Sequence, residues 1–441
     1  MEDAYIIKGG KPLSGSVILS GAKNVALKVI VSSLMLENET IIHNVPRIND
    51  VHELIHLINL LGAKVDFIDK NTVKVVPSSL SSNKVDLLHA SKIRVSFMFL
   101  APLLLKFGEC YIPNPGGCRI GARPIDRVVD GVQQLGISME YDSNTGYYHA
   151  KLIKRPTGRY RFSKSSHTGT ELLMLLSTLT ENEVKIENAA LEPEIDDLIS
   201  FLNKCGAKIR RVNKTIIINK SMLLKQKEPF TITSDRNEAV TYATLALSTG
   251  GTVVISKIPY ELINTFVEKV RQCGGGFQRV TEDTFRFFSQ NGIKPSNVET
   301  APHPGFMTDW QPNWAILMTQ ASGDSIISER VFENRFSYVE ELRKLGAEID
   351  FIKSPVINPQ DYFFFNFDPA KKYNQTIKIK GNQQLHGGVL NIADLRAGAT
   401  LAIAALIAKG ESYIYGASIL ERGYENFVEK VSRLGGEIIK I

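Results

Sequence analysis

The chain has 441 residues, enough for two large domains or three smaller ones with ample core. Its formal net charge of +6 is mild and no run of five or more basic residues occurs, which argues against a general nucleic-acid-binding protein and favours a small anionic substrate. No apolar run approaches the roughly 18 residues that a membrane span needs, and the first residues have neither the basic nor the apolar part of a signal peptide.

One short phrase recurs six times along the chain: an apolar helix end, a glycine, and then the start of a strand. Its copies lie at 61–65, 135–139, 205–209, 273–277, 345–349 and 434–438. Successive copies are about 70 residues apart, with a last gap nearer 90, and such spacing indicates an internal repeat. Glycine ends each helix because it adopts the left-handed cap conformation at low cost.

A helix of small and apolar residues, a turn and a β-rich run precede each copy, for example 25–36 followed by 40–43. These first helices are apolar on nearly every side, so we expect them to be buried, whereas the second helices, such as 194–204, are amphipathic and lie outside them. The pattern therefore predicts that each repeat has the element order strand–helix–strand–helix–strand–strand, with a parallel sheet packed on buried helices. If the six repeats divide into two bundles of three, the chain is an α/β protein with two similar lobes. We expect one lobe to be residues 22–232 and the other to be residues 1–21 plus 233–441.

The first junction of chemical interest is Ser-Gly-Ala-Lys-Asn at 20–24, between the first strand and the first buried helix. Gly21 permits close backbone approach, and Lys23 would project from a helix start, where anions are favoured. A serine N-cap beside a solvated lysine would give the same pattern. Arg94 opens another buried helix, where an unpaired arginine would be costly, so its charge needs an anionic partner.

The loop at 113–127, Pro-Asn-Pro-Gly-Gly-Cys-Arg-Ile-Gly-Ala-Arg-Pro-Ile-Asp-Arg, follows the second buried helix. Its prolines and glycines cannot continue a helix and predict a surface loop, where reactive groups tend to sit. Cys118 is flanked by Arg119 and Arg123, and cationic neighbours favour the thiolate and lower the pKa of a cysteine. The loop is therefore interpreted as a mobile lid with one activated sulfur; the alternative is a Gly-Pro turn with an incidental cysteine.

A second loop-to-helix junction at 303–311 contains Asp309, which could cap the helix or act as a general base for a hydroxyl proton. Acid–arginine pairs stand at equivalent junctions further along the chain: Glu333 with Arg335, Asp394 with Arg396, and Glu421 with Arg422. Helix starts and these cations, with Lys23, Arg94 and Arg123, would surround a cleft between the lobes with positive potential. Because arginine binds carboxylate and phosphate through a bidentate fork, the implied ligand is multiply anionic.

The four cysteines, Cys110, Cys118, Cys205 and Cys273, show no metal-ligand spacing. With no export signal, we expect free thiols in a reducing cytoplasm. No phosphate-binding loop, dinucleotide fingerprint or zinc-protease signature is present in the sequence, so neither a cofactor nor a metal is expected. An aromatic, proline-containing stretch at 354–373 interrupts the last repeats, and we expect a surface hairpin there rather than a regulatory element.

These motifs, in this order and over essentially the whole chain, resemble the UDP-N-acetylglucosamine enolpyruvyl transferase (1-carboxyvinyltransferase) family. They are the loop at 115–126, Ser-Gly-Ala-Lys-Asn, Pro-His-Pro-Gly-Phe-Met-Thr-Asp, Phe-Glu-Asn-Arg-Phe, Asp-Leu-Arg-Ala-Gly and Glu-Arg-Gly-Tyr-Glu. The resemblance implies an inside-out α/β barrel of two lobes with three repeats each. It implies transfer of enolpyruvate from phosphoenolpyruvate to the 3-hydroxyl of UDP-N-acetylglucosamine, the first committed step of peptidoglycan synthesis and the target of fosfomycin.

The resemblance also implies residue roles. Cys118 would donate a proton and hold phosphoenolpyruvate covalently, and Asp309 would take the proton of the attacking hydroxyl. The phosphate and carboxylate of phosphoenolpyruvate would be bound by Lys23, Arg123 and Arg422, with Asn24 adjacent. A lobe-closing network would consist of Arg335, Asp394 and Arg396. The nucleotide-sugar site would be lined by Arg94, Arg123, Pro124, Ile125, Asp126, Arg127, Lys164, Ser166, Gly169 and Val331.

Three stretches depart from the family pattern. The segment Lys-Ser-Ser-His-Thr-Gly at 164–169 replaces a commoner Ser-Val-Gly loop, Arg127-Val128 stands where many members have Leu-His or Gln-His, and 354–373 is longer than usual. These departures leave open another uridine nucleotide, such as UMP, as the acceptor. A catalytically inactive paralogue that only binds ligands is the non-enzyme alternative, although every catalytic position that the motifs match is occupied.

Overall fold

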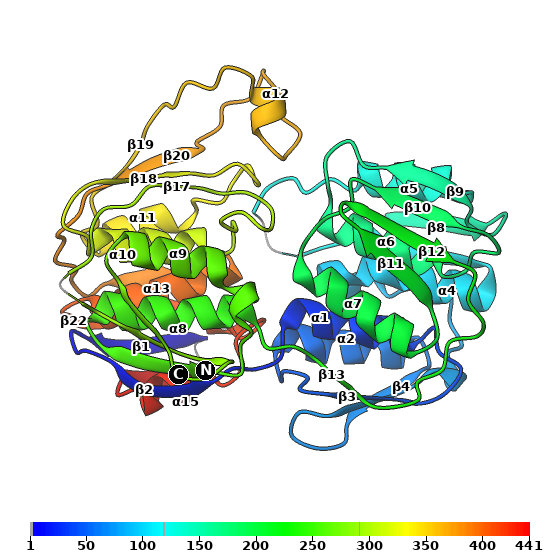
Figure 1. Cartoon of the computed structure of the whole chain (residues 1–441), viewed down its shortest axis with the longest axis horizontal. Coiled ribbons are helices and arrows are strands. Elements are labelled where there is room, and N and C mark those ends of the chain that lie inside the picture. Colours follow the sequence, from blue (N-terminus) through cyan, green and yellow to red (C-terminus); the bar gives the residue numbers. More distant parts are fainter. Residues whose placement is uncertain (1–2, 118–119, 291) are drawn as a thin grey trace. The chain divides into compact units, whose positions relative to one another are not determined.

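The computed structural model describes residues 3–117, 120–290 and 292–441 (Figure 1). The chain divides into two compact units. Residues 21–117 and 124–233 form what we call the central unit, and residues 3–20, 120–123 and 234–441 form the terminal unit. Cys118 and Arg119, which the sequence placed at the tip of the reactive loop, lie outside the described residues.

Buried helices form the middle of the central unit, as their apolar sequences predict. They are α1 (Lys23–Ser33), α4 (Leu100–Phe107), which continues the 3-10 helix η2 (Arg94–Phe99), and α6 (His167–Ser177). Outside them lie the amphipathic helices α2 (Asn49–Leu60), α5 (Asp126–Gln134) and α7 (Pro193–Lys204). The short elements η1 (Pro77–Ser79) and α3 (Leu87–Ala90) complete the helical part. Burial follows the expected order, because the inner helices are apolar on all sides and the outer ones on one side only.

The terminal unit repeats this arrangement. Its buried helices α8 (Arg236–Thr249), α10 (Gln311–Thr319) and α13 (Leu395–Ile407) contact one another. Many small residues in α13 allow close approach; a Cβ at Gly398, for example, would press on Ile392. The outer helices are α9 (Asn264–Gln272), α11 (Tyr338–Lys344) and α15 (Phe427–Arg433), with η3 (Tyr260–Leu262), α12 (Pro359–Tyr362) and α14 (Ala417–Leu420) as short elements.

Three sheets cover the described part of the central unit. Their strand orders are β13 (Phe230–Thr231), β3 (Thr40–His43), β5 (Val73–Val76), β4 (Lys64–Phe67); then β6 (Glu109–Pro113), β8 (Tyr147–Leu152), β7 (Ile137–Asp142); then β11 (Lys208–Val212), β12 (Thr215–Asn219), β10 (Val184–Glu187), β9 (Gly158–Arg161).

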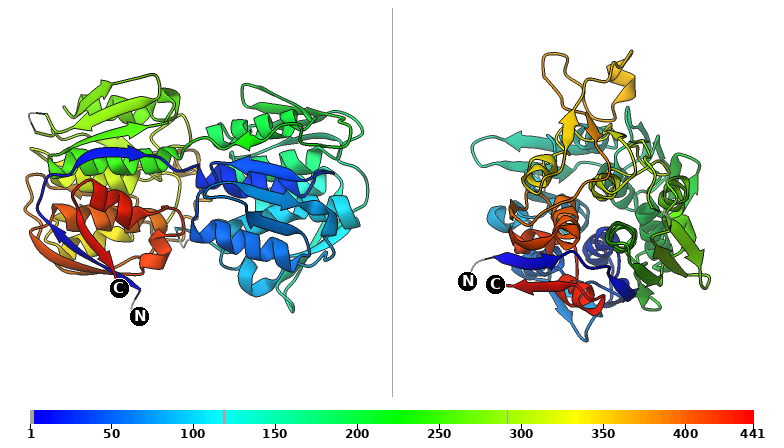
Figure 2. Two further views of the ribbon diagram at one scale, coloured as in Figure 1. Left: turned by 90° about the horizontal axis from the view of Figure 1, so that it is seen from below. Right: turned by 90° about the vertical axis from the view of Figure 1, so that its left-hand side faces the viewer.

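The described part of the terminal unit also has three sheets. Their orders are β21 (Val389–Asn391), β22 (Gly410–Tyr415), β1 (Ala4–Gly9), β23 (Glu437–Lys440); then β15 (Gly276–Arg279), β16 (Thr284–Phe288), β14 (Thr252–Ser256), β2 (Ser14–Ile18); then β17 (Val298–Glu299), β18 (Ser325–Ser328), β20 (Thr376–Ile379), β19 (Ile349–Phe351). Figure 2 shows β1 beside β23, so the first and last strands of the chain share one sheet.

The prediction of parallel sheets is wrong. Each four-stranded sheet contains one parallel pair, such as β9–β10, and its other pairs are antiparallel. A buried helix crosses over between the parallel strands in β9–α6–β10, β17–α10–β18 and β21–α13–β22. In most repeats the last two strands follow each other through a short turn, and a short turn can only join antiparallel strands.

The aromatic stretch at 354–373 joins the antiparallel strands β19 and β20, so the expected hairpin is present, and its long loop carries the short helix α12 (Figure 1). Its rings stack on one another, with the centroids of Phe363 and Phe365 4.8 Å apart and those of Phe363 and Phe367 5.5 Å apart. The loop docks on Arg330, whose guanidinium lies 4.2 Å from the ring centroid of Tyr362. Ring stacking therefore gives this stretch its own small core without strand pairing.

Candidate active site

Asp309 is the centre of a buried ion-pair network in the terminal unit. It lies just before α10 but does not cap that helix, because the N-cap position is Trp310. Its Oδ1 lies 2.8 Å from Nη2 of Arg335, and its Oδ2 lies 3.2 Å from Nε of Arg396. The arginine side chains are almost fully buried, whereas that of Asp309 remains 24% exposed. The network therefore presents a carboxylate, held from behind by two guanidinium groups.

Asp394 anchors both arginines. Its carboxylate caps α13 by accepting the backbone N–H groups of Arg396, at 3.0 Å, and Ala397, at 3.1 Å. The same carboxylate lies 3.4 Å from Nη1 of Arg335 and accepts the hydroxyl of Ser337 at 3.2 Å. One aspartate thus fixes both the helix start that carries Arg396 and the guanidinium of Arg335.

The two arginines set the charge of Asp309. Burial alone would raise the pKa of this carboxyl group, but the positive charges of Arg396 and Arg335, with a further contribution from Arg123, outweigh burial and lower the pKa to about 2. Asp309 is therefore ionised at neutral pH and can accept a hydrogen bond from a substrate hydroxyl.

Arg396 also rests on the turn between α14 and α15. Its guanidinium lies 5.4 Å from the ring centroid of Tyr424, and the hydroxyl of Tyr424 is 2.7 Å from that of Thr241 on α8. Arg422 belongs to this same turn and is half-buried. The turn therefore places a further arginine near the residues that support the Asp309 network.

The described end of the reactive loop, residues 120–123, contacts the segment before Arg335. The backbone N–H of Asn334 donates to the carbonyl of Ile120 at 3.2 Å, and the guanidinium of Arg123 lies 5.6 Å from the ring centroid of Phe332. Arg123 has a positive φ of 44°, which is uncommon for a residue other than glycine. A backbone held in this region is typical of functional loops.

Glu329 is a site residue that the sequence analysis missed. It is fully buried, and its carboxylate accepts the backbone N–H groups of Val331 at 2.7 Å and Phe332 at 3.1 Å and the hydroxyl of Thr308 at 2.8 Å. Burial raises the pKa of Glu329 above its ordinary value. It joins the segment of Asp309 to that of Val331, and its sequence signal is an acid placed directly after the β-rich run at 325–328.

In the central unit, Lys23 is the first residue of α1 and is buried, with its Nζ 2.7 Å from Oδ2 of Asp50. The alternative of a solvated lysine beside a serine cap is thus wrong, since the N-cap of α1 is Ala22 without a side-chain hydrogen bond. The backbone at Gly21 does approach another group closely, as predicted, and that group is the backbone carbonyl of Asn44. Asn24 is half-buried.

The other predicted residues of this unit gather at the starts of η2, α5 and α6. Arg94, half-buried, opens η2, and 124–127 lead into α5. The hydroxyl of Tyr160 on β9 donates to the carbonyl of Arg127 at 2.9 Å, which ties α5 to the strand before Lys164. The side chain of Ser166 caps α6 by accepting the N–H of Gly169 at 3.1 Å. The structure therefore ties Arg127 to β9, the strand that precedes 164–169.

Among residues 3–117, 120–290 and 292–441, no helix is long and apolar enough to cross a membrane. No group of three or more histidine, cysteine, aspartate or glutamate side chains there is arranged to hold a metal ion.

Comparison with known proteins identifies the family of this chain. The sequence model of EPSP synthase (3-phosphoshikimate 1-carboxyvinyltransferase) matches residues 7–431. The UDP-N-acetylglucosamine 1-carboxyvinyltransferase of Bdellovibrio bacteriovorus is 36% identical over 437 residues, 99% of this chain and 100% of that protein. The enzyme of the same name from Nitratidesulfovibrio vulgaris is 34% identical over 440 residues, 100% of this chain and 99% of that protein.

Solved structures share the fold. The enolpyruvyl transferase NikO from Streptomyces tendae superposes with a TM-score of 0.85 at 21% identity, covering 100% of this chain and 99% of NikO. EPSP synthase from Acinetobacter baumannii gives a TM-score of 0.74 at 15% identity over 100% of both chains. The expected enolpyruvyl transferase fold is thus confirmed. The chain belongs to the EPSP synthase family of carboxyvinyl transferases, together with the relatives named UDP-N-acetylglucosamine 1-carboxyvinyltransferase.

Proposed function

We propose that this enzyme transfers the enolpyruvyl group of phosphoenolpyruvate to the 3-hydroxyl of UDP-N-acetylglucosamine and releases phosphate, in the cytoplasm, as the first committed step of peptidoglycan synthesis. The observation that carries the proposal is the ionised, partly exposed carboxylate of Asp309 between Arg335 and Arg396. Two relatives named UDP-N-acetylglucosamine 1-carboxyvinyltransferase are 34% and 36% identical to this chain over nearly its full length, and they support UDP-N-acetylglucosamine as the acceptor.

The reaction has two halves. In the first, the 3-hydroxyl oxygen bonds to C2 of phosphoenolpyruvate while Asp309 accepts its proton and the thiol of Cys118 donates a proton to C3, which gives a tetrahedral ketal. In the second, C3 returns a proton to the thiolate of Cys118, the C2–C3 double bond reforms and phosphate leaves. A carboxylate with a pKa of about 2 is a weak base, so proton transfer to Asp309 accompanies carbon–oxygen bond formation, when the hydroxyl becomes acidic.

Cations would stabilise the anionic groups throughout. Fixed positive charge is most effective where it is already oriented before the reaction. The guanidinium of Arg335 is oriented by the carboxylates of Asp309 and Asp394, and that of Arg396 by the carboxylate of Asp309. We propose that phosphoenolpyruvate is bound by Lys23, Asn24, Arg123 and Arg422. The nucleotide sugar is proposed to contact Arg94, Arg123, Pro124, Ile125, Asp126, Arg127, Lys164, Ser166, Gly169 and Val331.

A phosphate-release assay tests the proposal. The purified enzyme is given phosphoenolpyruvate with UDP-N-acetylglucosamine, UDP-glucose, UDP or UMP in turn. We expect phosphate release with UDP-N-acetylglucosamine, and a product heavier than that sugar nucleotide by one enolpyruvyl group. Turnover with UMP alone would instead make another uridine nucleotide the acceptor, and no turnover with any acceptor would favour the inactive paralogue.

Fosfomycin labelling tests the role of Cys118. Burial raises the pKa of the Cys110 and Cys273 thiols and raises that of Cys205 to about 11, so these three are poor nucleophiles at neutral pH. We expect a single adduct, on the peptide that contains Cys118, with activity lost in parallel and labelling accelerated by the nucleotide sugar. Adducts on the other three cysteines, or none on Cys118, would contradict the proposed proton donor.

A further inference from the structure

The segment of the proposed proton acceptor and a turn proposed to contact the sugar share one buried carboxylate. Oε2 of Glu329 accepts the hydroxyl of Thr308 at 2.8 Å, and Thr308 directly precedes Asp309 in the chain. Oε1 of Glu329 accepts the backbone N–H groups of Val331 at 2.7 Å and Phe332 at 3.1 Å. One side chain therefore bridges the segment that carries the proton acceptor and the turn that carries Val331.

Glu329 lies too deep to contact a substrate itself. It is 0% exposed, whereas Asp309 and Val331 are both partly exposed. Two backbone N–H groups and one hydroxyl bind its two oxygens, so the carboxylate is directed at the protein's own chain. Any effect of Glu329 on the reaction is therefore transmitted through the residues that it holds.

The turn after Glu329 is also held by bonds that do not involve the carboxylate. The backbone N–H of Glu329 donates to the carbonyl of Gln375 at 2.7 Å, and the side-chain amide of Gln375 donates to the carbonyls of Glu329 at 2.9 Å and Phe332 at 3.0 Å. The backbone N–H of Arg330 donates to the hydroxyl of Thr300 at 2.8 Å. Burial of a carboxylate is costly, and a turn that is already fixed gains little stability from it. This cost points to a role in function.

The bond to Thr308 acts on the main chain beside Asp309. Arg335 and Arg396 hold the carboxylate of Asp309 at its oxygens, but the side chain projects from a segment outside any helix. The hydroxyl of Thr308 anchors that segment to Glu329, and its carbonyl oxygen lies 3.5 Å from Nε of Arg335. Because a misplacement of about 1 Å can slow an enzyme roughly 100-fold, a fixed main chain at this point favours catalysis.

We propose that Glu329 is a positioning residue, which sets the distance between Asp309 and a nucleotide sugar bound at Val331 through its hydrogen bond to Thr308. This inference rests on the proposed function, since it concerns the geometry of the same site. Glu329 neither receives the proton nor touches the substrate; it fixes the two segments that do.

The test is a double-mutant cycle on the bond between Thr308 and Glu329, with kcat and KM for UDP-N-acetylglucosamine measured by phosphate release. Thr308→Val removes the hydroxyl. Glu329→Gln can still accept both backbone N–H groups through its carbonyl oxygen, but it turns an amide donor toward Thr308. Each substitution removes a hydrogen bond to a charged group, so we expect each kcat to fall about tenfold. Because both remove the same bond, the double variant should also lose about tenfold rather than about 100-fold.

Three further measurements separate positioning from a purely structural role. The KM for UDP-N-acetylglucosamine should change less than about threefold, because the turn at Val331 is still held. Thr308→Ser keeps the hydroxyl and should recover most of the rate that Thr308→Val loses. Thr281→Val is the matched control, since the hydroxyl of Thr281 also donates to a carboxylate, that of Asp283 at 3.0 Å, on an exposed turn of the same unit. Its kcat, per folded protein as checked by thermal unfolding, should match the wild type.

The outcomes distinguish this inference from the proposed function. If the wild-type enzyme does not convert UDP-N-acetylglucosamine, the proposed function fails. If it does, but Thr308→Val keeps the wild-type kcat or the double variant loses the product of the two single losses, Glu329 does not act through Thr308 and only the inference is overturned. A loss of rate that follows the loss of folded protein would likewise make the carboxylate purely structural.

Discussion

Asp309 and Glu171 are both carboxylates held between two cations, but they face their surroundings in opposite ways. The Asp309 carboxylate is the exposed member of its network, and its cations, Arg335 and Arg396, are almost fully buried. In the other network Glu171 on α6 lies 3.2 Å from Lys28 on α1 and 3.1 Å from His167. There the Glu171 carboxylate is fully buried and a cation, His167, is the exposed member. The first network therefore presents a negative charge and the second a positive one.

The choice of cations adds a second difference. Arginine keeps its charge at every pH that a protein survives, so the Asp309 network has one charge state above the pKa of its carboxylate. An unperturbed histidine changes charge near neutrality, and the pKa of His167 is raised, so the Glu171 network, unlike the Asp309 network, changes its charge as pH rises. A constant charge suits the proposed role of Asp309 as proton acceptor, whereas the charge of the Glu171 network changes when His167 titrates.

The largest expected effect is on the first network. Asp309→Asn removes the proton acceptor but keeps the size of the side chain, so we expect the phosphate-release rate to fall by about 10³-fold, in the range of general-base losses. Attachment of phosphoenolpyruvate to Cys118, detected by mass spectrometry, should remain possible.

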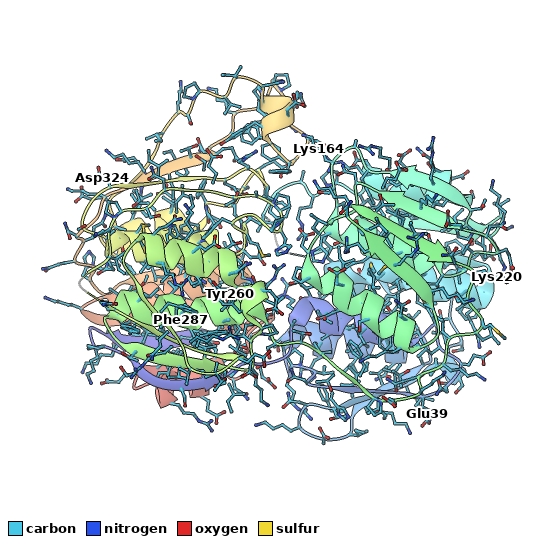
Figure 3. The ribbon with its side chains drawn as sticks, viewed as in Figure 1. Glu39, Lys164, Lys220, Tyr260, Phe287 and Asp324 are labelled. Carbon is cyan, nitrogen blue, oxygen red and sulfur yellow. The ribbon has the colours of Figure 1, made fainter. Side chains whose placement is uncertain are left out.

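Asp324→Asn is the control for that variant, because Asp324 is also paired, 2.8 Å from Lys378, but lies on the surface of the same unit (Figure 3). Its rate should match the wild type. Near-normal turnover by Asp309→Asn would show that the first network is structural and would remove the contrast with the second.

The second largest expected effect is a loss of unfolding free energy when the Glu171 network loses its lysine. Lys28→Met leaves Glu171 buried with only His167 as a partner, and breaking a buried ion pair from one side costs about 3 kcal/mol of unfolding free energy. Lys74→Met, which removes the exposed pair with Glu39, should cost less than about 1 kcal/mol. Urea titrations of the two variants give the comparison, and equal losses would mean that the charge of Lys28 is not needed inside the central unit.

Much of this fold follows from sequence, because the repeats, the buried helices and their capping glycines are local patterns. The pair His167–Glu171 is also local, since the two residues are four apart on one helix. The Asp309 network is not, because Arg335 is 26 residues away and Arg396 87 residues away, and only tertiary packing brings them to one carboxylate. Chain order alone likewise could not show that Ile120 and Arg123 contact 332–334.

The prediction of strand direction was wrong for a related reason. Alternation of strands and helices predicted parallel sheets, but the hairpins 64–76 and 208–219 are antiparallel. Each of those segments has two apolar runs separated by a few polar residues, and that short spacing was the available signal. Glu329 was missed because its sequence signal, an acid directly after the β-rich run at 325–328, does not reveal that the carboxylate is buried and accepts backbone N–H groups.

The smallest expected effect is the pH dependence of folding, and it separates the two networks by sign. The pKa of Asp309 is lower in the folded chain, about 2, than the ordinary value of about 3.9, so its network contributes about 2 kcal/mol at neutral pH that is lost as pH falls from about 5 toward 2. The pKa of His167 is higher in the folded chain, so its contribution is complete below about pH 6.5 and is lost as pH rises through the raised pKa. Unfolding free energies of Asp309→Asn, His167→Gln and the wild type from pH 3 to pH 9 measure both limbs. Asp309→Asn should flatten only the acid limb and His167→Gln only the alkaline one; if either variant changes the opposite limb, the two networks do not hold their charges in the opposite ways described above.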